Sequence, residues 1–209
     1  MNLIKRPFRY RYDNITLFLI GINILVFLAQ QVFAGRYIDY YIAMLPSAVL
    51  NGWIWQFVTY MFAHGGISHL LFNMLALFIF GAQVERRLGS AEFILYYLLT
   101  GILAGVFSFL VYWFTGQFGV LLMGASGAIF AVQLAYAAFF PDSVIYIWGI
   151  LPLRAPVMVL SFTVIELVSS ITGFRSGVAH LTHLAGFGFG WIYFLVRFGI
   201  NPWKALMRR

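Results

Sequence analysis

Residues 64–90 read HGGISHLLFNMLALFIFGAQVERRLGS, an apolar run that ends in a charged Glu-Arg-Arg cluster. A helix needs about 20 predominantly apolar residues to cross the hydrocarbon core of a bilayer. The stretch from Ile67 to Val84 comes close to that length, and few polar side chains interrupt it. It therefore predicts a membrane-spanning helix.

Five further runs of similar character lie on either side of this one. They predict membrane-spanning helices at about 15–34, 91–114, 124–140, 155–172 and 178–196. No internal repeat or domain boundary stands out, so we expect residues 1–209 to form one all-α, polytopic six-helix domain. Its parts outside the spans are short basic tails at 1–14 and 199–209 and an aromatic-rich first loop at about 35–66, partly embedded in the interface.

Composition excludes the main alternatives to a membrane protein. The chain is 63% apolar and 9% charged, whereas soluble domains carry about 25% charged residues. Cysteine is absent, which excludes disulfides, thiol nucleophiles and thiolate metal sites. The net charge of +7 resides in Lys and Arg at the ends of the apolar runs. We interpret these residues as anchors to anionic membrane lipids and expect no nucleic-acid partner.

The distribution of basic residues predicts the orientation. With a cytoplasmic N-terminus, only Arg36 and Arg175 lie outside. The inner side then holds Lys5, Arg6, Arg9, Arg11, Arg86, Arg87, Arg154, Arg197, Lys204, Arg208 and Arg209. This asymmetry indicates that both termini are cytoplasmic, in the plasma membrane.

A few polar side chains fall inside the spans, where an unpaired polar group is costly. They are His69, Asn73, Ser126, Glu166 and His183. We measured the height of each residue from the cytoplasmic end of its span at 1.5 Å per residue. His69, Ser126 and His183 lie about 25, 24 and 21 Å above that end. The similar depths predict one polar site built from three helices, near the outer face.

That site has the parts needed for acyl transfer. His183 is a candidate base for the hydroxyl of Ser126. No Asp or Glu lies at this depth on the same three spans, so we expect a dyad without an acid. Gly124 and Gly127 flank Ser126 and leave room for a substrate backbone. His69 and Asn73 could donate hydrogen bonds to an oxyanion.

Other interpretations of these residues stay open. Asn73 could only join helices, and Glu166 could be neutral or paired with a neighbouring helix. The pairs Gly186/Gly190 and Gly101/Gly105 indicate close helix packing. A proton-coupled transporter that uses Glu166 and His183 is the alternative function.

A metal site is the other alternative. It would draw on His64, His69, His180 and His183. We expect none, and no other cofactor, because no carboxylate accompanies these histidines and water satisfies His64 and His180 at the outer boundary.

Three motifs in order resemble those of the rhomboid intramembrane proteases. They are the His69-xxx-Asn73 helix with its Glu-Arg-rich turn, MGASGAIFA at 123–131, and AHLTHLAGFGFG at 179–190. The resemblance covers the chain from Trp55 to Gly190. It implies a serine endopeptidase that cleaves transmembrane segments of other proteins.

The resemblance also implies residue roles. Ser126 would be the nucleophile and His183 the base. The oxyanion hole would consist of His69, Asn73 and the Ser126 amide. Phe130 would pack on the catalytic imidazole, and Gly186 belongs to the His-xx-Gly motif. Gln56 departs from the family, which often has Arg there, and this questions how the first loop is anchored. The fifth span and the loop at about 177–182 would form the gate.

Overall fold

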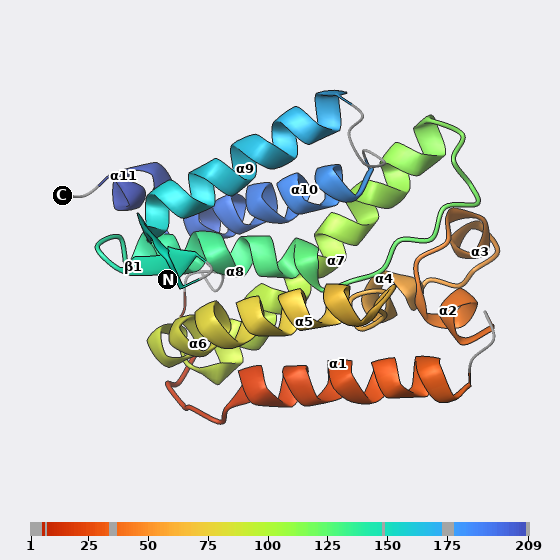
Figure 1. Ribbon diagram of the computed structural model, residues 1–209, viewed down its shortest axis with the longest axis horizontal. Coiled ribbons are helices and arrows are strands. Elements are labelled where there is room, and N and C mark those ends of the chain that lie inside the picture. The colour runs from red at the N-terminus through yellow and green to blue at the C-terminus, as the bar shows by residue number, and fades with distance from the viewer. Residues whose placement is uncertain (1–5, 7, 34–36, 148, 173–177, 208–209) are drawn as a thin grey trace.

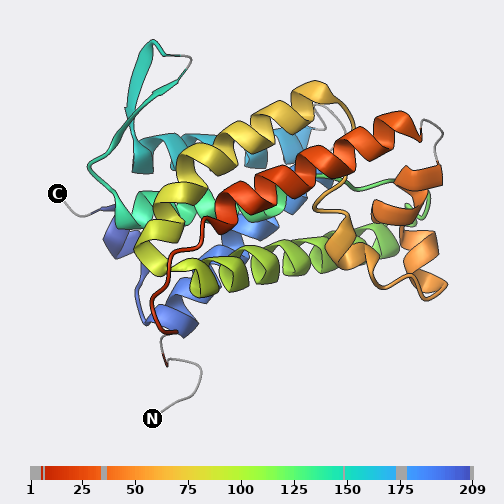
Figure 2. The same cartoon turned by 90° about the horizontal axis from the view of Figure 1, so that it is seen from below.

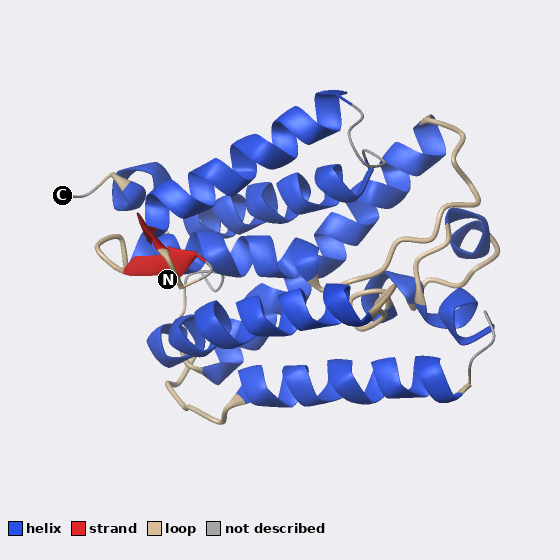
Figure 3. Cartoon of the chain, in the orientation of Figure 1, coloured by secondary structure: helices blue, strands red, loops and turns tan. Residues whose placement is uncertain are grey.

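The computed structural model describes residues 6, 8–33, 37–147, 149–172 and 178–207, without the side chains of 178 and 179. Most of this is helical (Figure 3). The helices are α1 Ile15–Val32, α2 Tyr37–Ile42, α3 Pro46–Leu50, α4 Gln56–Thr59, α5 Ile67–Ala76, η2 Leu77–Gly81, α6 Ala82–Leu88, α7 Ser90–Phe114, α8 Ser126–Phe139, α9 Ala155–Thr172, α10 Val178–Tyr193, η3 Phe194–Phe198 and α11 Pro202–Leu206.

The six predicted long helices are confirmed, with ends that differ by a few residues. They are α1, the continuous α5–η2–α6 segment, α7, α8, α9, and α10 with η3. Within the described residues, four helical segments are long and apolar enough to cross a membrane: Ile15–Val32, Ile67–Leu88, Ser90–Phe114 and Ala155–Thr172. The chain is a multi-pass membrane protein.

The helices run side by side, and α8 lies in the middle of the bundle (Figure 1). It contacts α5, α6, α7, α9 and α10, and most of its residues are buried. At 14 residues, α8 is about 21 Å long, so it cannot cross a core of about 30 Å by itself. Its first residue, Ser126, therefore lies inside the bundle, short of the level at which the neighbouring longer helices end.

The six helices alternate in direction along the bundle. Figure 1 places α6, α11 and a small β-hairpin at one end, and α2, α3 and α4 at the other. The hairpin pairs β1 (Val144–Ile147) with β2 (Leu151–Arg154) in antiparallel register, and it projects from the bundle (Figure 2). The sequence analysis did not foresee it. Its first strand is made of β-branched and aromatic residues, which favour strands, and Gly149 supplies a positive φ in the turn.

Gln56 anchors the first loop. It is completely buried in α4, accepts a hydrogen bond from the Leu45 N–H, and donates one to the Tyr40 carbonyl at 2.8 Å. Buried backbone groups need such partners. The question raised by the missing arginine is thus answered, because the amide of Gln56 ties the loop to its own backbone.

The carboxylate of Glu85 binds the start of α1 from α6. It accepts hydrogen bonds from the backbone N–H groups of Ile15 and Thr16, the Thr16 hydroxyl and the Ser90 hydroxyl. The first N–H groups of a helix lack partners within the helix, and a negative charge there interacts favourably with the positive end of the helix dipole. Glu85, which carries no exposed surface, therefore joins α1, α6 and α7 at one end of the bundle.

We predict that Glu85→Ala lowers the free energy of unfolding by at least about 3 kcal/mol, because it leaves two helix-terminal N–H groups and two hydroxyls without an acceptor. Unfolding of the detergent-purified protein measures the loss. Glu85→Gln, which keeps one acceptor oxygen, should lose less. Gln83→Ala, an exposed change on the same helix, is the control. Equal stability of Glu85→Ala and this control would contradict the assignment.

Candidate active site

Ser126 is the first residue of α8, after a sharp turn. The turn is made at Gly124, whose φ of +120° disfavours a residue with a side chain. A Cβ at Gly124 would also lie 2.7 Å from two atoms of the His69 ring. Glycine therefore lets α5 approach the turn closely enough to set His69 beside the start of α8. The first N–H groups of α8 have no partners within the helix.

His183 of α10 meets Ser126. Its Nε2 lies 2.7 Å from the Ser126 Oγ, a hydrogen-bond distance. The ring of Phe130, one turn after Ser126, stacks on the imidazole with centroids 4.7 Å apart and planes 6° from parallel. The serine and the phenylalanine thus hold the imidazole from two directions.

Two glycines permit this meeting. A Cβ on Gly186 would lie 1.9 Å from the Gly127 carbonyl oxygen, so the backbones of α10 and α8 touch. Gly186 follows His183 by one turn, and Gly127 follows Ser126 directly. The predicted close helix packing is confirmed at Gly190, where a Cβ would overlap Tyr96 of α7 and press on Ala131 of α8. Gly101 and Gly105 of α7 instead lie against Met61 and Tyr60, which follow α4.

A cavity of about 330 Å³ opens beside the serine and histidine. Its lining includes His69, Phe72, Asn73, Ala76, Ser126, Ile129, Phe130, Gln133, Phe162, Ile165, Glu166 and His183. Among the described residues, the Asn73 Nδ2 and the Gln133 Oε1 are buried without a hydrogen-bond partner. Both can bind a substrate or water in the cavity.

Sequence reasoning overlooked Gln133. A signal was present, because Gln133 follows Ser126 by seven residues and so lies two turns along the same face of α8.

The expectation that water satisfies His64 and His180 at the outer boundary is wrong. His64 is buried, its ring Nδ1 contacts the Phe62 carbonyl, and the ring packs edge-on against His69. The His180 Nδ1 lies 2.5 Å from Oε2 of Glu166, which reaches across from α9.

The expectation that no carboxylate accompanies the histidines is also wrong. Oε1 of Glu166 lies 3.1 Å from the His183 Nδ1. The sequence count missed this contact because it compared only the second, fourth and sixth helices, whereas Glu166 is on the fifth. Glu166, His180 and His183 each offer one potential metal-ligand atom, all within 4.8 Å of one another.

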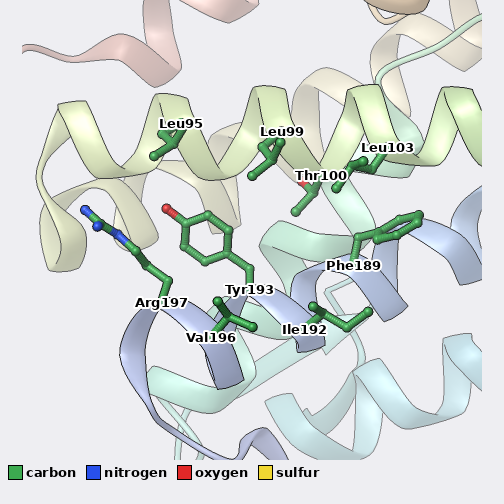
Figure 4. A pocket seen from close by; sticks show the side chains of 9 residues that line it. All are labelled: Leu95, Leu99, Thr100, Leu103, Phe189, Ile192, Tyr193, Val196 and Arg197. Atoms are coloured by element: carbon green, nitrogen blue, oxygen red, sulfur yellow. The ribbon is translucent and has the colours of Figure 1, made fainter. Parts of the chain in front are cut away.

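A second recess, between α7 and the α10–η3 segment, is almost entirely apolar (Figure 4). Its polar side chains are already engaged: Tyr193 and Arg197 both bind the Glu92 carboxylate, and the Thr100 hydroxyl binds the Tyr96 carbonyl. The polar side chains that line this recess therefore join helices to one another.

Comparison with known proteins identifies the family of this chain. The family model of the Rhomboid domain matches residues 51–200. The chain belongs to the rhomboid family. The rhomboid protease GlpG of Haemophilus influenzae is 27% identical over 188 residues, which are 90% of this chain and 93% of that protein.

Two further relatives align over shorter stretches. The rhomboid protease GlpG of Salmonella newport is 31% identical over 120 residues, 56% of this chain and 44% of that protein. YdcA of Bacillus subtilis is 38% identical over 88 residues, 42% of each chain. The alignments therefore span less than half the length of these two rhomboid relatives.

The structure brings together every residue that the sequence analysis assigned to the site. Ser126, His183, His69, Asn73 and Phe130 line one cavity, and three glycines allow the helices to approach: Gly124, Gly127 and Gly186. Of the expected gate loop at 177–182, residue 177 lies outside the described residues and 178–182 are the first residues of α10.

We predict that Gly186→Ala destabilises the protein by about 1–3 kcal/mol or more, because the added methyl group overlaps the Gly127 backbone and forces α10 from α8. Thermal unfolding in detergent measures this. Gly188→Ala is the matched control on the same helix, since a Cβ there meets nothing within 4 Å. If the two variants unfold at the same temperature, the contact between the two backbones is not required.

Proposed function

We propose that this chain is an intramembrane serine protease, working as one rhomboid domain. It hydrolyses peptide bonds in or near transmembrane segments of other membrane proteins through Ser126, His183 and an acyl-enzyme. The observation that carries the proposal is the 2.7 Å approach of the Ser126 Oγ to the His183 Nε2 inside a cavity, in a member of the rhomboid family.

The reaction follows from this contact. As the Ser126 Oγ bonds to the substrate carbonyl carbon, its proton passes to the His183 Nε2 and the carbonyl π electrons move to the oxygen. When the tetrahedral intermediate collapses, the C–N bond breaks and the leaving nitrogen takes the proton from Nε2. Water then attacks the ester, gives a proton to Nε2, and the acid product leaves as the serine recovers its proton.

The negative oxygen of the intermediate needs hydrogen-bond donors. Asn73 Nδ2 is buried, unpartnered within the described residues, and lines the cavity. The His69 ring lies against the Gly124 turn, and the Ser126 N–H is at the start of α8. These three groups form the proposed oxyanion hole, where preorganised donors stabilise the transition state.

The setting of the enzyme is part of the proposal. The excess of Lys and Arg on one side supports cytoplasmic termini and a catalytic cavity toward the outer face of the plasma membrane. Its substrates are transmembrane proteins and its surroundings are membrane lipids, with no nucleic acid and no cofactor. A helical substrate must unwind locally, because hydrogen bonds and side chains shield the peptide bonds of a helix.

A proton-coupled carrier would also use the contact between Glu166 and His183. That function leaves the hydrogen bond between Ser126 and His183 without a role, and the two GlpG relatives are named as proteases. Proteolysis explains more of the cavity.

We predict that a fluorophosphonate labels the detergent-purified protein at Ser126, since the hydroxyl is activated by His183. Ser126→Ala abolishes labelling, and His183→Ala slows it more than about 100-fold. Gel fluorescence and mass spectrometry of the labelled peptide follow the reaction. An unlabelled wild-type protein that moves protons in liposomes would favour the carrier instead.

We predict that Asn73→Ala lowers kcat on a transmembrane reporter substrate on the order of 100-fold with a smaller change in KM, because an oxyanion donor acts mainly in the transition state. Asn51→Ala is the matched control, since Asn51 is exposed and is not among the residues that line the cavity. A change in kcat of less than threefold for Asn73→Ala would remove this residue from the oxyanion hole.

A further inference from the structure

The carboxylate of Glu166 lies between two imidazoles. Oε1 is 3.1 Å from the His183 Nδ1, and Oε2 is 2.5 Å from the His180 Nδ1. The Glu166 side chain is 16% exposed, so most of its surface is withdrawn from solvent. An acid in a membrane-spanning helix is costly and marks a functional role more often than a structural one.

The protonation of His183 decides what Glu166 can do. Nε2 faces the Ser126 hydroxyl, and it can accept a proton only if the neutral ring carries its own proton on Nδ1. That Nδ1–H needs an acceptor. Among the described residues it makes no aligned hydrogen bond, yet the Glu166 Oε1 lies at hydrogen-bond distance.

His180 limits how the carboxylate can turn. His180 and His183 are three residues apart on α10, so both rings lie on one face of that helix. The short contact of His180 with Oε2 leaves Oε1 directed at His183. Among the described residues that line the cavity, the other ionisable group is His69 on α5, which supplies no negative charge.

We propose that Glu166 is a positioning residue for the hydrolysis proposed above: it holds His183 in the Nδ1–H tautomer and places a negative charge beside the imidazolium, and His180 holds Glu166. The inference rests on the proposed function and extends its dyad to four side chains in contact: Ser126, His183, Glu166 and His180. The serine proton moves to Nε2, Nδ1 keeps its proton, and the Glu166 carboxylate neither gains nor loses one.

A purely structural role for Glu166 makes the opposite prediction for two conservative variants. Glutamine has the size of glutamate and keeps hydrogen bonding but has no charge, whereas aspartate keeps the charge and is shorter by one methylene. Interhelical packing would tolerate Glu166→Gln better than Glu166→Asp. A charge that orients and stabilises His183 requires the reverse order.

The test measures kinact and KI for a fluorophosphonate on full-length protein in detergent. We expect Glu166→Gln to lower kinact at least about tenfold with KI within threefold of wild type, because loss of the acid from a related catalytic triad costs up to about 10⁴-fold. Glu166→Asp should retain more of kinact. The matched control is Ser170→Ala, one turn along α9, whose exposed hydroxyl bonds only to the Leu167 carbonyl of its own helix.

His180 supplies a second measurement. Since it acts through Glu166, His180→Ala should lower kinact in the wild-type background and change it less than threefold in the Glu166→Gln background. Additive losses in the double variant would overturn the part assigned to His180.

The outcomes separate the inference from the proposed function. Suppose that the wild-type protein is labelled and that Ser126→Ala abolishes the labelling. If Glu166→Gln is then labelled within threefold of wild type, or changes only KI, the inference is overturned and the protease proposal stands. Wild-type protein that does not label overturns both. Unfolding temperatures identify lost folding. Should Glu166→Gln unfold, Glu166→Asp carries the test, and its loss of labelling while folded overturns the inference.

Discussion

The site depends on the contact between the backbones of α8 and α10. Gly186 and Gly127 meet with no room for a side chain, and Ser126 and His183 lie within one turn of that contact. Between helices in lipid the hydrophobic effect gives little attraction, so close packing through small residues provides much of it. The same two glycines therefore contribute to the bundle's association and fix the distance between Ser126 and His183.

The second constraint is that polar groups inside the bilayer need partners within the protein. The bundle meets it with a few carboxylates and amides. Glu85 accepts from the start of α1, and Gln56 satisfies the backbone of the first loop. Glu92 pairs with Arg197 between α7 and the end of the sixth long helix. The Asn73 Nδ2 and the Gln133 Oε1 are buried in the lining of the cavity and have no hydrogen-bond partner within the described residues.

Much of the fold could be predicted from the sequence because hydropathy fixes the spans, and 1.5 Å per residue fixes depth along each one. That counting brought Ser126, His183 and His69 to one level. It says nothing of how each helix is rotated or which helices are neighbours. The contacts of Glu166 with His180 and His183 depend on both, and so they escaped the count. The buried position of His64 and the hairpin likewise depend on how the loops turn back onto the bundle.

One consequence concerns the order of events during turnover. α9 supplies Phe162, Ile165 and Glu166 to one wall of the cavity, and much of its remaining surface is exposed. If α9 swings outward to admit a substrate, the wall and the charge beside His183 leave together. Admission and proton transfer would then exclude each other in time. A transmembrane segment would be cut only after the wall has returned. Segments that dissociate before then would not be cleaved, so the residence time in the cavity would contribute to substrate specificity.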